Sequence, residues 1–135
     1  MTHQIRSIST VAITLSTAAK NASADAIVDL IDVGTGTAIV RIKDAADVIL
    51  AQLNLSNPAF GNAAVGVATA NAITDDSSAD ASGIASKFDA TDRDGTVVFD
   101  GTVTANGGGG DMTLVSTTLT AGEVVQISSF SLAQP

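Results

Sequence analysis

The sequence predicts a mainly β protein, a single-domain β-sandwich of jelly-roll type with one short N-terminal α-helix. Short runs rich in β-branched residues are separated by turn signals about every ten residues, as in all-β sandwiches. Only one stretch, residues 16–32, shows helical spacing of its apolar residues. The 135 residues fit one domain. We expect an arm or edge strand at 1–14 and the sandwich domain at 15–135.

Residues 1–14 are predicted to be extended. One side of the segment would carry Ile5, Val11 and Ile13, and the other Arg6 and Ile8, although the alternation is imperfect. A strand without a partner exposes unpaired N–H and C=O groups, which tend to pair with another strand. We therefore expect this arm to pair with its own sheet or with another subunit.

The helix expected at 16–32 begins at Ser16, a good N-cap residue, and ends before Gly34, which suits a left-handed cap. Apolar residues recur at three- and four-residue spacing and predict one buried face. Those residues are Ala18, Ala19, Ala22, Ala26, Ile27 and Leu30. Lys20, Asn21, Asp25, Asp29 and Asp32 are assigned mainly to the opposite face.

After Gly36 the residue pattern is typical of β-strands. Strands are expected at 37–43, 48–55 and 63–72, and Pro58 helps to stop the second because proline cannot donate to a sheet. A hairpin is predicted from strands 84–90 and 97–103 around the turn at 92–95, with Phe88 and Phe99 on one face. After a glycine-rich loop at 106–111, we expect a strand at 112–117, a turn at 118–122 and a closing strand at 123–132.

Composition excludes several functional classes. The net charge of −8 gives no electrostatic footprint for nucleic acid, and the absence of Trp and Tyr removes the usual base-stacking platforms. The absence of cysteine excludes thiol chemistry and Cys–zinc sites. No apolar run approaches the length of a membrane span, and the N-terminus lacks the pattern of a signal peptide. We therefore expect neither nucleic acid nor membrane as a partner.

Catalytic chemistry is poorly represented. The single histidine, His3, lies in the predicted arm, and the single glutamate, Glu123, lies beside a turn glycine. The aspartates cluster in loops, where turn formation accounts for them. The segment 92–95 resembles part of an EF-hand loop, but its first ligand and bidentate Glu are missing. The sequence leaves one alternative, a weak surface calcium site at Asp75, Asp76 and Asp80. We predict no enzyme, no cofactor and no catalytic or metal residue.

Four stretches carry a family resemblance. They are Asn57–Gly61, Gly66–Ile73, Asp80–Ala85 and Asp92–Val103, joined by the helix segment Leu15–Ile27 and the ending Leu114–Val125. Together they resemble small proteins encoded among the structural genes of tailed double-stranded DNA bacteriophages. The likeness runs from about Leu15 to the C-terminus and does not cover the arm.

This resemblance implies a structural role in a virion. Capsid decoration, or cement, proteins are often small, acidic, β-rich and oligomeric, so decoration of the major capsid protein shell as a homotrimer is the leading expectation. It implies a location on the capsid exterior after synthesis in the host bacterial cytoplasm. A tail, neck or fibre-base protein and a receptor-binding module remain alternatives. The expected partner-binding residues are Ile5, Arg6, Ile8, Val11 and Ile13, and deletion of residues 1–12 is expected to abolish capsid binding but spare the fold.

Overall fold

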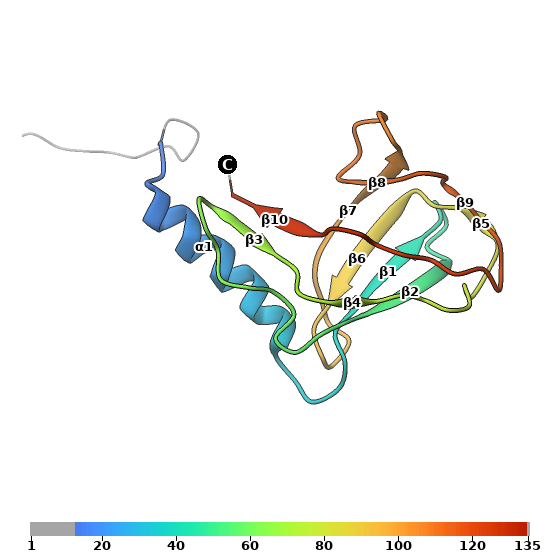
Figure 1. Cartoon of the computed structure of the whole chain (residues 1–135), viewed down its shortest axis with the longest axis horizontal. Coiled ribbons are helices and arrows are strands. Elements are labelled where there is room, and N and C mark those ends of the chain that lie inside the picture. The colour runs from blue at the N-terminus through green and yellow to red at the C-terminus, as the bar shows by residue number, and fades with distance from the viewer. Residues whose placement is uncertain (1–12, 135) are drawn as a thin grey trace, which may run out of the picture.

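The computed structural model describes residues 13–134 and has one helix and a curled six-stranded sheet (Figure 1). The sheet order is β4-β2-β1-β6-β7-β8, and two further two-stranded sheets pair β10 with β3 and β5 with β9. The elements are α1 (Thr17–Asp29), the 3-10 turn η2 (Leu30–Asp32), β1 (Ile39–Lys43), β2 (Ile49–Leu55), β3 (Val67–Thr69), β4 (Ile73–Thr74), β5 (Gly83–Ile84), β6 (Lys87–Thr91), β7 (Val97–Ala105), β8 (Met112–Leu114), β9 (Thr118–Leu119) and β10 (Ser131–Ala133). The predicted class, a mainly β sandwich with a short N-terminal helix, is confirmed.

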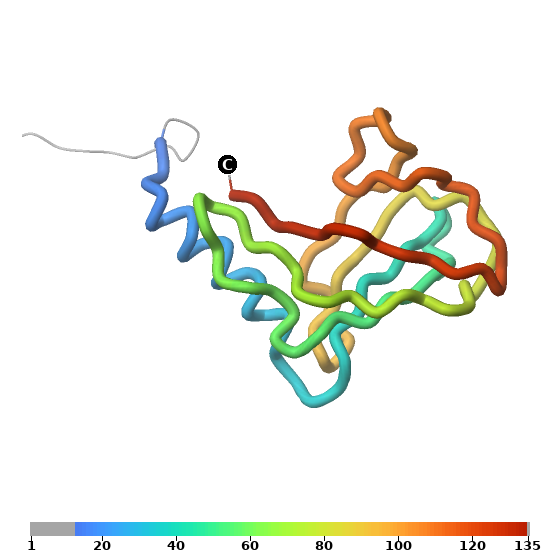
Figure 2. Tube along the Cα trace, in the orientation of Figure 1, coloured from blue at the N-terminus to red at the C-terminus, as the bar shows by residue number. Residues whose placement is uncertain are grey.

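The second layer of the sandwich is largely irregular. The chain after β9 runs back across the sheet and ends beside β3 and α1 (Figure 2). The core between the layers consists mainly of small and branched side chains, together with Phe60 and Phe88. Val40, Ile42 and Leu53 on the central strands are fully buried. The alternating burial of β1 leaves Arg41 and Lys43 on the opposite, polar face of the sheet.

All four phenylalanines form one cluster within this core. The ring of Phe130 lies 5.8 Å from that of Phe60, 5.7 Å from Phe88 and 5.9 Å from Phe99, measured between centroids. Because Phe88 is opposite Gly101 and Phe99 is opposite Ala90, the two hairpin rings lie diagonally on one face, as predicted. Phe130 thus attaches the C-terminal segment to the sheet.

The helix begins as predicted, since the Ser16 side chain accepts a hydrogen bond from the Ala19 N–H at 3.1 Å. The predicted buried face is wrong. The helix buries Ala24 and Val28, followed by Ile31 in η2, whereas Leu30 is 53% exposed.

The polar residues of the helix explain this rotation. Asn21 accepts a hydrogen bond from the Gly66 N–H at 2.7 Å, Asp25 from Ala63 at 2.6 Å and Asp32 from Ala59 at 2.9 Å. Residues expected on the outer face therefore supply acceptors to a chain that runs antiparallel along the helix. A buried backbone N–H needs such a partner, and a small apolar side chain at those positions supplies none.

The strand predictions differ from the structure mainly in the second layer. The strand expected at 63–72 is reduced to β3 and isolated bridges, and the hairpin strand expected from residue 84 begins at Lys87 because Gly83–Ile84 pairs with β9 instead. The expected closing strand at 123–132 is wrong. Within the described part of the chain, only Val125, bridged to Asp76, and β10 make ladder contacts there. The turn at 92–95 is confirmed, with Gly95 at a φ of 91°.

Candidate functional site

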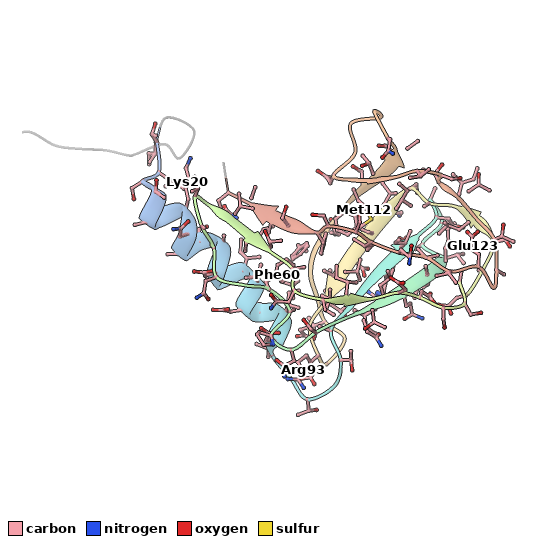
Figure 3. The ribbon with its side chains drawn as sticks, in the orientation of Figure 1. Lys20, Phe60, Arg93, Met112 and Glu123 are labelled. Atoms are coloured by element: carbon pink, nitrogen blue, oxygen red, sulfur yellow. The ribbon has the colours of Figure 1, made fainter. Side chains whose placement is uncertain are left out.

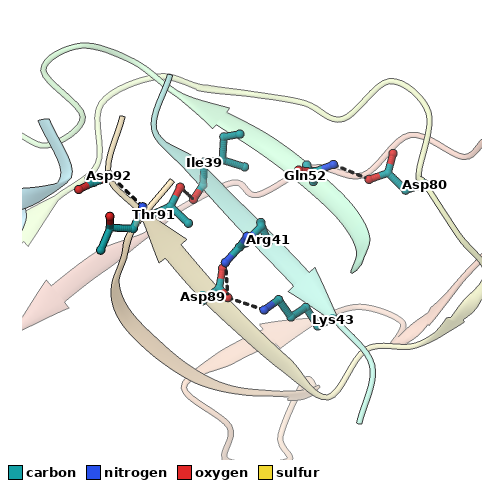
Figure 4. Close-up of polar contacts among 9 residues, drawn as sticks. Ile39, Arg41, Lys43, Gln52, Asp80, Asp89, Thr91 and Asp92 are labelled. Carbon is teal, nitrogen blue, oxygen red and sulfur yellow. Dashed lines mark hydrogen bonds and ion pairs between the residues drawn. The ribbon is translucent and has the colours of Figure 1, made fainter. Parts of the chain in front are cut away.

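The polar face of the sheet carries a cluster of one anion and two cations. The register pairs Arg41 on β1 with Asp89 on β6. The Asp89 carboxylate accepts hydrogen bonds from Arg41 Nε at 2.6 Å and Nη2 at 2.9 Å, and its second oxygen lies 2.6 Å from Lys43 Nζ (Figure 4). Asp89 is only 5% exposed. Bidentate pairing with arginine makes this a strongly directed contact.

The two cations determine the charge state of Asp89. Burial by itself raises the pKa of this carboxyl, but the hydrogen bonds and charges of Arg41 and Lys43 outweigh it and hold the pKa below its ordinary value. Asp89 is thus an anion that is already fully engaged by its neighbours.

A hollow of about 600 Å³ opens beside this cluster, between β1, β6 and β7. Lys87 at its edge pairs with Asp47 at 2.8 Å. The Asp111 carboxylate accepts hydrogen bonds from the N–H and the hydroxyl of Thr102, both at 2.9 Å, and these hold its pKa below the ordinary value. Each of these ionised groups is paired with another residue that lines the hollow, so we assign the hollow a structural role.

The aspartates in the loops likewise accept hydrogen bonds from neighbouring groups of the protein. Asp92 accepts hydrogen bonds from the N–H groups of Asp94 and Thr96, which closes the hairpin turn. In the loop considered for calcium, Asp75 binds Gln126, while Asp76 and Asp80 bind the backbone and side chain of Gln52. Among residues 13–134, no three metal-ligating side chains gather in a group that could hold an ion.

The end of the molecule away from α1 exposes apolar side chains. Val115 is 93% exposed, Ile84 65% and Val124 60%. Val115 and Val124 line one shallow hollow of about 270 Å³, which Thr118 also lines, and Thr118 pairs with Ile84. Glu123, next to Val124, marks this end in Figure 3, opposite Lys20 on the helix. Clustered exposed apolar side chains are typical of interaction sites. We call Ile84, Val115 and Val124 the apolar end.

Of the five predicted partner-binding residues, the structure describes only Ile13. Ile5, Arg6, Ile8 and Val11 lie outside the described residues. Ile13 is 43% exposed just before α1, so the structure does not bring it to the apolar end. Sequence reasoning missed the apolar end because Val115 and Val124 were assigned to ordinary strands. The available signal was their closeness to turns, because Val115 directly precedes a run of Ser and Thr and Val124 lies two residues after Gly122.

Comparison of the chain with protein-family models, curated proteins and solved structures found no match. No helix among residues 13–134 is both long and apolar enough to cross a lipid bilayer.

Proposed function

We propose that the protein is a non-enzymatic structural component of a tailed-phage virion. It decorates and stabilises the capsid by binding the outer surface of the major capsid protein shell. The sequence resemblance over residues 15–135 supports the virion role, together with the small, acidic, β-rich character of the chain. The assignment to the shell rests on analogy with decoration proteins.

The observation that carries the docking role is the apolar end. Three aliphatic side chains at 60–93% exposure leave water only if another surface covers them. Each contributes little alone, at about 25 cal/mol per Å² of apolar surface buried. Repetition over many copies on a shell, and linkage between copies in an oligomer, multiplies such weak contacts.

Binding to empty expanded shells tests the proposal. Purified protein is mixed with shells of the major capsid protein from the phage that carries this gene, and the bound fraction is measured by co-sedimentation. We expect wild-type protein to bind and Val124→Asp to bind at least about tenfold more weakly, because a charge would have to be desolvated in the contact.

Val65→Asp is the matched control. Val65 is 79% exposed and precedes Gly66, which is hydrogen-bonded to the helix, so it lies at the opposite end of the molecule. This variant should bind like wild type. Equal binding by both variants would show that the apolar end takes no part in the contact. Absence of binding by the wild-type protein would overturn the proposal of decoration itself.

The number of copies per virion separates the shell from the alternative site. Hundreds of copies, counted by quantitative mass spectrometry, agree with decoration. A few to a dozen copies would instead place the protein in the tail, the neck or a fibre base.

A further inference from the structure

We propose that the groove beside β8 receives the N-terminal segment of a second copy as an added β-strand. The groove has a volume of about 430 Å³ and lies between β8 and the C-terminal segment 126–131. We call it the β8 groove. The proposal concerns self-association and is tested without capsids, although Val115 lines both this groove and the hollow at the apolar end.

Both walls of the groove offer free backbone groups. Within residues 13–134, no N–H or C=O of residues 126–129 takes part in a backbone hydrogen bond or accepts one from a side chain. On the other wall, the Leu114 carbonyl accepts a hydrogen bond from Asn106 and thus faces β7. Since alternate residues of a parallel strand point to opposite sides, the N–H and C=O of Thr113 point away from β7. Such unpaired edges bind extended chains by strand addition.

The topology leaves a place for one more strand. The Asp76–Val125 bridge joins the C-terminal segment to the chain after β4, at one edge of the six-stranded sheet. β8 is the other edge, and the curl of the sheet brings it to the same groove as 126–131 (Figure 1). A strand between them would continue the sheet from β8 to the C-terminal segment. Closing a sheet in this way removes both exposed edges.

The groove also has an apolar lining. Met112 is 7% exposed, and Leu114, Ile127 and Phe130 are partly buried against the core. An added strand with apolar residues on one side would cover these side chains while its polar side faces solvent.

The N-terminal segment has the matching character. Ile5, Val11 and Ile13 share one side of an extended chain, and the 12 residues before Ile13 exceed the six of the groove wall 126–131. A fully extended chain spans about 3.3 Å per residue, so 12 residues would span about 40 Å, which is long enough to cross into a neighbouring copy. α1 starts at the end of the protein away from β8, which favours the groove of another copy (Figure 1).

Each copy would donate one segment and offer one groove. Such reciprocal contacts are satisfied only when the copies close into a ring. A ring of three agrees with the homotrimer expected for a decoration protein.

Cross-linking between two kinds of chain tests the contact directly, because the protein contains no cysteine. Chains carrying only Ser9→Cys are co-expressed with C-terminally tagged chains carrying only Ser128→Cys, and a short bismaleimide is added. Mixed dimers, recognised by their mass, can form only between copies. The control replaces Ser128→Cys by Asp29→Cys, an exposed position on α1.

We expect about tenfold or more mixed dimer with Ser128→Cys than with Asp29→Cys, because docking raises the local concentration of the two thiols. Equal yields for the two pairs would overturn the proposal. So would a chain carrying both Ser9→Cys and Ser128→Cys that cross-links only within itself, since the segment would then occupy its own groove.

Solution mass provides a second test in the full chain. Light scattering should give a multiple of 13.4 kDa for wild type, and three copies if the ring is a trimer. Val11→Asp should dissociate it, because a charge would face the apolar lining, whereas Thr10→Asp adds the same charge on the solvent side. A monomeric wild type, or identical masses for the two variants, would contradict the proposal.

Discussion

Asp89 and Arg41 form a bidentate ion pair across β1 and β6, although they lie 48 positions apart in the chain. The side chain of Asp89 is 7% exposed, whereas those of Arg41 and Lys43 keep 22% and 18%. The Asp89 carboxylate is therefore shielded from water, whereas the two cationic side chains stay partly hydrated. This pair ties the central strands of the sheet on the face opposite the apolar core.

Asp89→Asn should lower the free energy of unfolding. Removing one partner of a buried ion pair costs ~3–5 kcal/mol, and partial hydration of the two cations reduces our expectation to about 2 kcal/mol. Urea denaturation followed by far-ultraviolet circular dichroism measures it, since the chain lacks Trp. Asp100→Asn is the matched control, because Asp100 lies opposite Asp89 on β7 but is exposed. Equal losses in the two variants would contradict a special role for Asp89.

Stability should fall in acid with a contribution from Asp89. Because the pKa of Asp89 is lowered in the folded protein, the unfolded chain binds its proton first as pH falls. The contribution is complete above the ordinary carboxyl pKa of about 3.9 and is lost as pH falls through the lowered folded value. The difference in stability between wild type and Asp89→Asn, measured from about pH 6 to about pH 2, should narrow in that window. A constant difference would show that the charge of Asp89 is not its cause.

Phe130→Ala should destabilise the protein by about 2–3 kcal/mol, below the cost at a fully buried site, because Phe130 is only partly buried. The variant removes the ring that contacts the other three phenylalanines. Phe130→Leu keeps much of the volume and should lose about half as much. Denaturation midpoints compare the two. If alanine and leucine cost the same, packing of the C-terminal segment onto the sheet does not depend on the ring.

Asp25→Ala should cost about 1–2 kcal/mol, because it leaves the Ala63 N–H without its acceptor. Asp29→Ala is the control on the same helix, because Asp29 is exposed and the amides of Ala59, Ala63 and Gly66 bind other side chains. It should be neutral or slightly stabilising, since alanine is the better helix former. Hydrogen exchange of the amides at 59–66 should accelerate in Asp25→Ala only. Unchanged exchange there would show that the helix does not hold this segment.

Local patterns in the sequence determined most elements of the sheet and the start of the helix. Ser16 caps α1, the runs 39–43 and 49–55 form β1 and β2, and Gly95 makes the hairpin turn. Each depends on residues within a few positions, where side-chain alternation, capping and backbone sterics act directly. The net charge and the absence of cysteine were equally available from the sequence.

Tertiary structure decided the helix face, the course of residues 123–132 and the apolar end. Asn21 and Asp25 turn inward because backbone groups 38–45 residues away need acceptors. Phe130 packs against three rings that are distant in sequence, and residues 126–129 pair with no strand within residues 13–134. Val115 and Val124 are residue types typical of buried strands, yet they stay exposed among the residues that the structure describes. Their placement depends on which distant segments meet, and local periodicity carries no information about that.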